Sequence, residues 1–422
     1  MSKLGILTLD MGQPQVVLGI DIGSSKVAAA VGRFAEGGIE VAGMAKVTNH
    51  GLRKGQVVDI AETVTAISAL LEDIERVTQT PVTHATVGIG GVHVETTSSK
   101  GVIAVSRPDG EITPQDVDRV LEAARAVAMP ANREIIHVLP KAFTVDAEGG
   151  IVDPVGMTGI RLEVDAHVVT CASPAVKNLV RAVTQAGLSV GDLVFAPLAT
   201  AELILTKRQK ESGVALIDIG AGTTSLAVYE EGDLVHAVVL PIGSMHITND
   251  IAIGLRTSID LAEAIKVKYG TALKDDVRDD TIDLTEIDPN ELQRPKARYI
   301  AEIIEARLSE LFLMVNDELR KIGKDGTLPA GVVFTGGGSR LTGIVELAKN
   351  SLHLPAKLGH PALELSGSVD KVDDPSYATA VGLVLWSLSG PPATTAPHQS
   401  FSIDGMEGAI GKARDFLRQL LP

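Results

Sequence analysis

Short apolar runs that end at glycine alternate with amphipathic segments along the first half of the chain. The run at 16–23 is rich in valine, isoleucine and leucine, stops at a glycine and continues after a short turn into a second apolar run at 26–34, which predicts a β-hairpin. Apolar residues at helical spacing predict helices over 60–78 and 114–128. This order of segments predicts a fold that mixes α-helices and β-strands.

The unit of apolar strand, glycine turn and second apolar strand occurs twice. At 213–243 an apolar strand again runs into Asp-Ile-Gly, followed by small or hydroxyl residues and another apolar strand. A repeat of a whole supersecondary unit carries more weight than either copy alone. It predicts two related halves that face one another across a cleft. A third strand that ends in glycines, at 330–340, precedes a helical pattern at 341–350.

The second half of the chain carries long helical patterns. They cover 258–269 and 296–320, and an acidic stretch at 274–291 that favours irregular structure separates them. A last apolar helix is predicted over 375–388. The stretch that follows, to about residue 403, is rich in proline, threonine and serine, which is typical of a linker.

Composition narrows the fold class and the partners. Of the 422 residues, 45% are hydrophobic but only 3% are aromatic, so valine, isoleucine, leucine and alanine must build the core, which favours α/β layers. The net charge of -15 argues against nucleic acid as a partner and limits any contact with an anionic membrane to a local segment. No apolar run reaches the ~18 residues of a membrane span, and 1–15 lacks the apolar region of a signal peptide. We expect a protein that is neither exported nor transmembrane.

The first glycine turn places an acid beside groups that bind phosphate. Asp21 stands at the end of the buried strand, and the turn after it contains Gly23, Ser24, Ser25 and Lys26. Backbone N–H groups in such a turn can point at an anion, and the lysine adds positive charge. This turn is therefore a candidate phosphate site.

The second turn offers the same chemistry. Asp218 is followed by Gly220, Gly222, Thr223 and Thr224, and the two glycines let the backbone approach a phosphate closely. Two such hairpins could hold a polyphosphate between them. The aspartates of the two turns then suit a Mg²⁺ ion bound through water, and they are the tentative catalytic residues.

A third turn consists of Gly336, Gly337, Gly338 and Ser339, whose small side chains would admit a base or a ribose. Any one glycine-rich turn is more often only a tight loop, but three in this order with both aspartates favour a nucleotide site. The P-loop pattern GxxxxGK[ST] does not occur, and Leu341 stands where the dinucleotide fingerprint needs its third glycine. A P-loop ATPase and a Rossmann dehydrogenase are therefore disfavoured.

The three turns, in this order, resemble the two phosphate motifs and the adenosine motif of the superfamily that contains actin, heat-shock chaperones and sugar kinases. Within that superfamily the match sharpens to the FtsA family of bacterial cell-division proteins. The segments that carry this match are 51–60, 135–146, 153–169, 260–270 and 377–386. The resemblance extends from about Val16 to the C-terminus.

The resemblance implies an actin-like, ribonuclease-H-like α/β fold of two lobes around a nucleotide cleft, with an inserted small α+β subdomain and a C-terminal amphipathic helix. In the terms used for actin, it divides the chain into subdomain 1A (14–86, 167–196 and 373–388), the inserted subdomain 1C (87–166), subdomain 2A (197–242 and 312–372), subdomain 2B (243–311), a flexible linker (389–404) and the amphipathic helix (405–422).

The resemblance also implies a function. Proteins of this family bind ATP and Mg²⁺, polymerise, tether the ring of FtsZ, the tubulin-like division GTPase, to the inner face of the cytoplasmic membrane, and recruit later membrane proteins of division. Glu263 and Lys266 match positions that hold adenine and ribose, and their i, i+3 spacing places them on one helical face, although a surface ion pair has the same spacing. Arg298 and Arg307 lie on the helix that takes the acidic, apolar FtsZ tail; a solvated helical face is an equal alternative for either one.

Hydrolysis is expected to be slow or negligible. Relatives among the heat-shock chaperones carry a glutamate before a proline ahead of the second phosphate motif, where it helps to activate water, but Ala196 precedes Pro197 here. Loss of a positioned general base typically reduces the rate by about 10²- to 10⁴-fold. We expect firm binding of Mg–ATP with little turnover.

The last residues have a helical pattern of their own. On a helical wheel one apolar arc contains Met406, Ile410, Phe416, Leu417, Leu420 and Leu421. A helix of this length spans about 24 Å and would lie in a membrane interface, on the cytoplasmic face, without crossing it. The alternative is a helix that docks on the protein's own body.

Two other classes share parts of the pattern. An actin-like scaffold of pilus assembly is the closer rival, although that class generally lacks a terminal amphipathic helix. A sugar or acyl kinase shares the phosphate motifs but has no use for a linker and a terminal helix.

Overall fold

The computed structural model describes residues 16–35, 38–127, 131–367 and 369–389. The predicted terminal helix, with Met406, Ile410, Phe416, Leu417, Leu420 and Leu421, lies outside these residues, as does the predicted linker from 390 onward. Among the described residues, no helix combines the length and the apolar character that a membrane span requires.

The first lobe is built on a six-stranded sheet. Its strands lie in the order β11 (Ser189–Phe195), β6 (His84–Ile89), β1 (Val17–Ile22), β2 (Lys26–Ala35), β3 (Gly38–Thr48) and β17 (Ser366–Gly367). The predicted hairpin is confirmed, because β1 pairs antiparallel with β2. The strand β1 also pairs in parallel with β6, which places the apolar β1 in the interior of the sheet.

The second lobe repeats this topology. Its five-stranded sheet has the order β14 (Asp233–Leu240), β13 (Thr224–Glu230), β12 (Val214–Ile219), β15 (Val332–Thr335) and β16 (Ala356–Leu358). Here β12 pairs antiparallel with β13 and in parallel with β15, as β1 does with β2 and β6.

The register is the same in the two lobes. Asp21 lies opposite Ala28 on its antiparallel neighbour and Gly88 on its parallel neighbour. Asp218 lies opposite Ser225 and Thr335 in the corresponding pairings. The two halves inferred from the sequence repeat are thus confirmed as two related sheets, and each carries its aspartate at the same point of the central strand.

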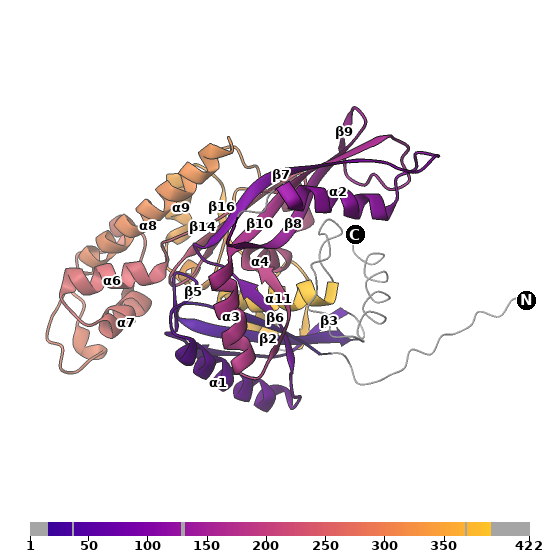
Figure 1. Cartoon of the computed structure of the whole chain (residues 1–422). Coiled ribbons are helices and arrows are strands. Elements are labelled where there is room, and N and C mark those ends of the chain that lie inside the picture. The colour runs from indigo at the N-terminus through magenta and orange to yellow at the C-terminus, as the bar shows by residue number, and fades with distance from the viewer. Residues whose placement is uncertain (1–15, 36–37, 128–130, 368, 390–422) are drawn as a thin grey trace, which may run out of the picture.

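Two helices join the sheets. The helix α11 (Ala378–Ser389) packs on β1 and β2, and α4 (Ala196–Ile204) contacts both α11 and strands of the second sheet. They cross at Gly382, where an added Cβ would lie 2.1 Å from the carbonyl oxygen of Ala199. Only glycine allows this approach. On the outer face of the first sheet, α1 (Ile60–Thr78) lies beside α3 (Ser173–Gln185), as Figure 1 shows.

A four-stranded sheet forms the insert in the first half, at the top of Figure 1. The order is β7 (Val94–Ala104), β10 (Arg161–Ala172), β8 (Arg133–Val145) and β9 (Glu148–Ile151), and α2 (Pro114–Val127) packs on it. The insert has a hydrophobic core of its own around Leu162 and Val120. Its strand β7 also touches the second lobe, because the Thr96 hydroxyl donates to the carbonyl oxygen of Ala237 at 2.7 Å.

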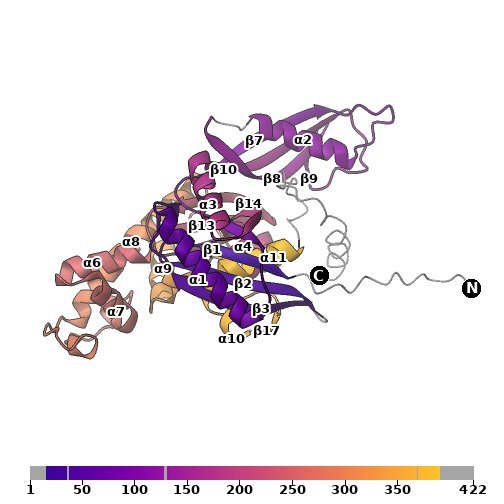
Figure 2. The same ribbon diagram turned by 60° about the horizontal axis from the view of Figure 1, so that its bottom comes forward.

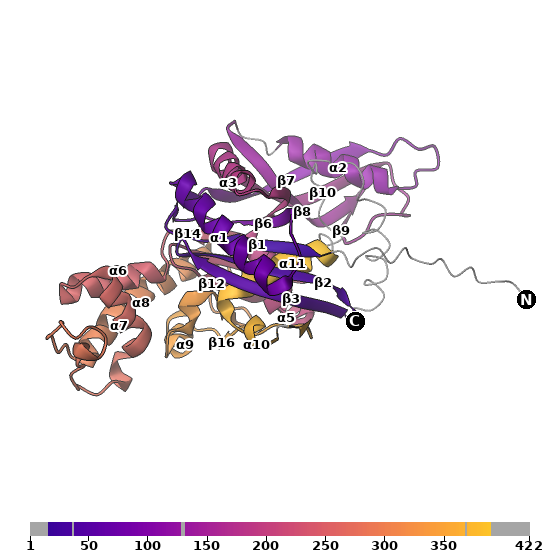
Figure 3. The ribbon, with the colours of Figure 1, turned by 90° about the horizontal axis from the view of Figure 1, so that it is seen from below.

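A helical unit extends from the second lobe on another side of the molecule (Figures 2 and 3). It contains α6 (Ser244–Leu255), α7 (Ile259–Tyr269) and α8 (Ala297–Lys321), and α6 packs on both of the others. The predictions of helices over 258–269 and 296–320 are confirmed to within one residue. The remaining elements are β4 (Leu52–Arg53), β5 (Gln56–Val57), α5 (Lys207–Ser212), α9 (Ile344–Leu352), α10 (Val369–Val372) and four short 3-10 turns.

Candidate functional site

The two glycine turns have the same geometry. The Gly23 N–H donates to the Lys26 carbonyl oxygen at 2.9 Å, and the Gly220 N–H donates to the Thr223 carbonyl oxygen at the same distance. Each turn follows the central strand of its sheet, so the two turns face one another from the two lobes. Between them lies a pocket of about 750 Å³ when its open mouth is included.

Most of the residues predicted to bind the nucleotide and its metal line this pocket. They are Asp21, Gly23, Ser24, Ser25, Lys26, Asp218, Gly220, Gly222, Thr223, Gly336 and Gly337. Segments that are far apart in the sequence thus meet in one cleft, as the repeat predicted.

Three predicted residues shape the turns from behind and do not line the pocket. The buried Thr224 hydroxyl donates to the Ile242 carbonyl oxygen at 2.8 Å, and the buried Ser339 hydroxyl donates to the Gly336 carbonyl oxygen at the same distance. An added Cβ on Gly338 would lie 2.4 Å from the Ile219 side chain. These residues hold the backbone of the second and third turns in place.

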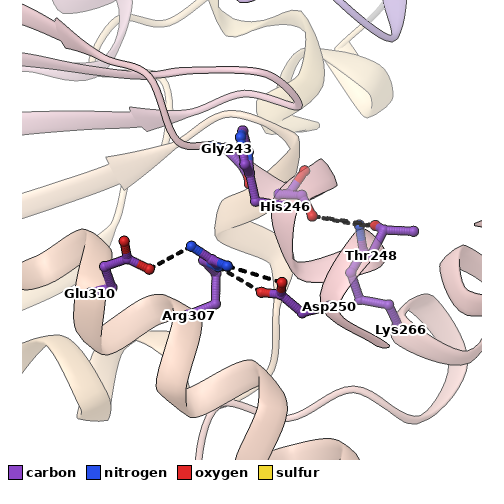
Figure 4. Close-up of polar contacts among 8 residues, drawn as sticks. Gly243, His246, Thr248, Asp250, Lys266, Arg307 and Glu310 are labelled. Atoms are coloured by element: carbon purple, nitrogen blue, oxygen red, sulfur yellow. Dashed lines mark hydrogen bonds and ion pairs between the residues drawn. The ribbon is translucent and has the colours of Figure 1, made fainter. Parts of the chain in front are cut away.

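Glu263 and Lys266 lie outside the pocket wall, on one face of α7. The buried Lys266 ammonium donates to Glu263 at 2.7 Å. It also donates to the Thr248 hydroxyl at 2.8 Å, and Figure 4 shows these two residues side by side. It also reaches the Ser244 carbonyl oxygen at 3.3 Å, at the start of α6. The Ser244 N–H donates to the Gly220 carbonyl oxygen at 2.8 Å. The pair is therefore tied to the second glycine turn through the first residue of α6.

The cleft concentrates negative charge. Burial and, to a smaller extent, the Asp21 carboxylate raise the pKa of Asp218 to about 6, and the Lys26 ammonium opposes both effects. Burial likewise raises the pKa of Asp21, against the influence of Lys26. The Lys26 ammonium is itself engaged, because it donates to the Ser376 carbonyl oxygen. One lysine faces two carboxylates, so the site is short of positive charge and chemically suited to a hydrated divalent cation.

The structure adds pocket residues that the sequence reading missed. They are Ile22, Gly55, Gly88, Gly90, Ala221, Ser225, Pro375, Ser376 and Thr379. A signal existed for Gly88 and Gly90, since they end an apolar strand as the other site glycines do. Thr379 had no local signal; its hydroxyl reaches Asp218 at 3.4 Å only because α11 packs between the lobes.

Ala196 lines the pocket beside Gly90, and its Cβ is 3.5 Å from the position that a Cβ on Gly90 would occupy. The residue that the sequence reading singled out for its missing carboxylate therefore faces the cleft. Within the described part of the chain, Asp21 and Asp218 provide the only carboxylates of the pocket wall.

The two arginines of α8 have different surroundings. The Arg307 guanidinium donates to both oxygens of Asp250, at 2.6 and 2.9 Å, and this contact fastens α8 to α6 (Figure 4). It also donates to Glu310, on α8 itself, at 2.5 Å. Arg298 is more exposed and lines a second, shallow hollow together with Lys296, Tyr299, Glu302 and Asp279. Its guanidinium contacts Asp275 at 3.1 Å and Glu302 at 3.5 Å.

Two sheets of one topology, two joining helices and a pair of matched glycine turns define an actin-like ATPase fold. Solved structures agree. The type IV pilus biogenesis complex PilM–PilN has a chain that aligns with a TM-score of 0.65 at 19% identity, over 87% of this chain and 97% of that one. MreB5 of Spiroplasma citri bound to ADP aligns with a TM-score of 0.52 at 14% identity, over 88% of this chain and 96% of that one. Identities this low show the fold alone.

Sequence comparison identifies the family. The family model described as cell division protein FtsA matches residues 215–382, and the one described as the SHS2 domain inserted in FtsA matches residues 91–170. FtsA of Pseudomonas aeruginosa is 41% identical over 379 residues, which is 89% of each chain. FtsA of Bacillus subtilis is 38% identical over 375 residues, 89% of this chain and 84% of that one. This chain belongs to the FtsA family of cell-division proteins, which confirms the resemblance found in its sequence.

Proposed function

We propose that the protein binds Mg–ATP in the cleft and uses it as a structural ligand. The observation that supports this most strongly is the matched pair of turns, each closed by the same backbone hydrogen bond and each preceded by an aspartate at the same register. The phosphates would lie between the turns, and Asp21 and Asp218 would hold Mg²⁺ through water. A related fold, MreB5, was solved with ADP bound.

We assign the base and ribose of ATP to the predicted residues of the second lobe that do not belong to the two phosphate turns. Gly336 and Gly337 line the second lobe's side of the pocket, and the pair Glu263 and Lys266 lies outside the pocket wall, tied to the second glycine turn through Ser244. We propose that base and ribose bind there. Glu263 and Lys266 already form an ion pair with each other, and the Thr248 hydroxyl hydrogen-bonds to both, so a nucleotide would compete for Glu263, the more exposed partner.

Turnover is proposed to be slow or absent. A methyl group stands at Ala196, where a carboxylate would be needed to activate water, and the pocket wall offers no other carboxylate within the described residues besides the two proposed to hold the metal. ATP would then bias the closure of the two lobes through its different affinity for two states. Hydrolysis by the purified protein faster than a few turnovers per minute would contradict this part.

The division role of the family leads to a wider proposal. We propose that the protein polymerises, that the insert recruits later division proteins, and that the α6–α7–α8 unit binds the C-terminal peptide of FtsZ. The hollow beside α8 supports the last point, because the exposed Tyr299 ring supplies apolar surface and Lys296 and Arg298 are two cations that the carboxylates of a peptide could bind. The peptide would replace the carboxylates of the protein itself that now pair with these two cations. Arg307 is proposed to position α8, since its guanidinium is engaged with Asp250 and Glu310. The subdomain boundaries expected from the sequence remain part of this proposal.

Membrane attachment is assigned to residues 405–422. Burying Ile410, Phe416 and the three leucines would contribute roughly 1.5 to 3 kcal/mol each at full burial, and the cost of ordering a short helix offsets much of this gain. Lys412, Arg414 and Arg418 against Asp415 leave a small positive side-chain charge, worth on the order of 1 kcal/mol per basic residue near anionic lipid. We therefore propose reversible, mainly apolar binding that polymerisation strengthens by avidity.

Liposome flotation tests the proposed binding to the membrane and to the FtsZ peptide. The full-length protein is mixed with vesicles and a fluorescent peptide of the FtsZ C-terminus, and the chain that ends at Ser389 serves as the control for membrane binding. We expect the full-length protein to float and to carry the peptide, the truncated chain to stay behind, and Arg298→Glu to float without peptide. Equal flotation of the two chains would remove the anchor. Capture of a pilus-type peptide in place of the FtsZ peptide would favour the scaffold of pilus assembly.

A further inference from the structure

A small hairpin stands at the junction of the cleft and the insert. The strands β4 and β5 pair Leu52 with Val57 and Arg53 with Gln56, and the two turn residues between them have positive φ angles, 51° for Lys54 and 76° for Gly55. Leu52 and Val57 are buried in the core of the first lobe. The turn is therefore presented from a fixed base.

This turn touches both phosphate turns. The Gly55 N–H donates to the Ser24 hydroxyl at 3.2 Å, and Gly55 itself lines the pocket. The backbone nitrogen of Lys54 lies 3.4 Å from the position that a Cβ on Gly222 would occupy. The hairpin therefore spans from the first lobe's turn to the second lobe's turn.

The same turn packs on the root of the insert. An added Cβ on Gly55 would lie 2.4 Å from the carbonyl oxygen of Gly90, which is too close for any side chain. The Val92 N–H points at the Lys54 carbonyl oxygen at 3.5 Å, two residues before β7 begins. A displacement of this turn would therefore move the backbone where the chain enters the insert.

Lys54 is an uncommitted cation at this place. It is exposed, and no ion pair or side-chain hydrogen bond engages its ammonium within the described residues, whereas Lys26 is already bound to Ser376. Turns of this kind favour asparagine or glycine at the first position, so a lysine there is conformationally unfavourable, and such positions cluster at functional sites. Its charge sits on a flexible four-carbon stem that can reach an anion beside the turn.

We propose that Lys54 binds the terminal phosphate of the nucleotide, and that the hairpin that carries it links this contact to the root of the insert. The proposal rests on the proposed binding of ATP in the cleft. Lys54 would then distinguish ATP from ADP, and the backbone at residues 90–94 would be held differently in the two bound states.

Nucleotide titrations of the full-length protein test this proposal. Lys54→Asn removes the charge and keeps a residue that tolerates the positive φ, so the fold is preserved. We expect its affinity for Mg–ATP to fall about 10-fold, as for the loss of one charge-assisted contact, with affinity for Mg–ADP changed less than about 2-fold and Lys54→Arg close to the unmodified protein. Arg53→Asn is the matched control, with the same charge change one residue away, and it should leave the ratio of the two affinities unchanged.

Hydrogen exchange supplies the second readout. ATP should slow the exchange of amides at 90–94 in the unmodified protein more than ADP does, and this difference should vanish in Lys54→Asn. If the unmodified protein binds ATP but Lys54→Asn keeps the same preference for ATP over ADP, or if Arg53→Asn loses that preference equally, the role of Lys54 is wrong while the proposed function stands. If the unmodified protein binds neither nucleotide, the proposed function fails and this inference with it.

Discussion

Replacing Asp218 by asparagine should stabilise the empty protein and abolish its stabilisation by nucleotide. Asp218 is the second-last residue of β12 and lines the cleft, and burial, aided by the Asp21 carboxylate, raises its pKa to about 6 from an ordinary value of 3.8. A raised carboxyl pKa means that the folded state binds the proton more tightly than the unfolded state does. Stability therefore falls as the pH rises from about 4 to 6 and stays reduced above that range.

The magnitude follows from the size of the pKa shift. A shift of roughly two pH units corresponds to at most about 3 kcal/mol of lost stability at neutral pH, and partial solvation of the cleft reduces this to about 1 to 3 kcal/mol. Asparagine removes the charge and keeps an oxygen for the Thr379 hydroxyl, which contacts Asp218 at 3.4 Å. For a folded body of this size the unfolding entropy is about 0.8 kcal/mol per kelvin, so the melting temperature should rise by roughly 1 to 4 °C.

The assay is a thermal melt at pH 7.5 in a chelator, repeated with Mg–ATP. We expect Asp218→Asn to melt higher than the unmodified protein without nucleotide and to lose most of the increase that Mg–ATP gives. Asp192→Asn is the matched control: burial raises the pKa of Asp192 to about 6 as well, but this residue lies outside the pocket wall. It should raise the melting temperature and keep the response to nucleotide. An Asp218→Asn protein that melts lower in chelator, or that responds fully to Mg–ATP, would refute the reasoning.

Three further predictions concern the joining helices, the cleft rim and hydrolysis. Gly382→Ala should lower the free energy of unfolding by about 1 to 3 kcal/mol, because the new methyl group meets the Ala199 carbonyl oxygen; an unchanged melting curve would contradict it. Asp374→Asn should reduce the loss of melting temperature that the protein shows as the pH falls from 4 toward 2. Burial opposes ionisation of Asp374, but hydrogen bonds from Ser376 and the Lys46 ammonium outweigh it and hold the pKa at about 2, so the carboxylate stabilises the fold above pH 4 and loses this effect as the pH falls toward 2. Ala196→Glu should raise ATP turnover at least about 10-fold, since it places a carboxylate in the cleft; no increase in a phosphate-release assay would show that another feature limits hydrolysis.

The repeated turns could be predicted because their information is local. Each Asp-Ile-Gly run is read within one strand and one turn, and the hairpins around Asp21 and Asp218 follow from short apolar runs. The parallel partners of these strands, β6 and β15, are distant in sequence, so their pairing follows only from the folded sheets. Pocket residues such as Thr379 were missed for the same reason.

The arginines of α8 show what the local sequence cannot predict. Helical spacing correctly placed Arg298 and Arg307 on one long helix, but nothing in the local sequence indicates that Asp250 holds Arg307 from another helix. Lys54 was likewise passed over, because its importance lies in what its turn touches. Charge at a site is visible in the sequence, whereas the partner of each charge depends on the packing of distant elements.

The most direct test of the central claim is a structure of the full-length protein with Mg²⁺ and a non-hydrolysable ATP analogue. Our account predicts phosphate oxygens within hydrogen-bond distance of the backbone N–H groups at 24–26 and 221–223, with the metal held through water by Asp21 and Asp218. An analogue bound elsewhere, or a cleft that stays empty at saturating analogue, would contradict it.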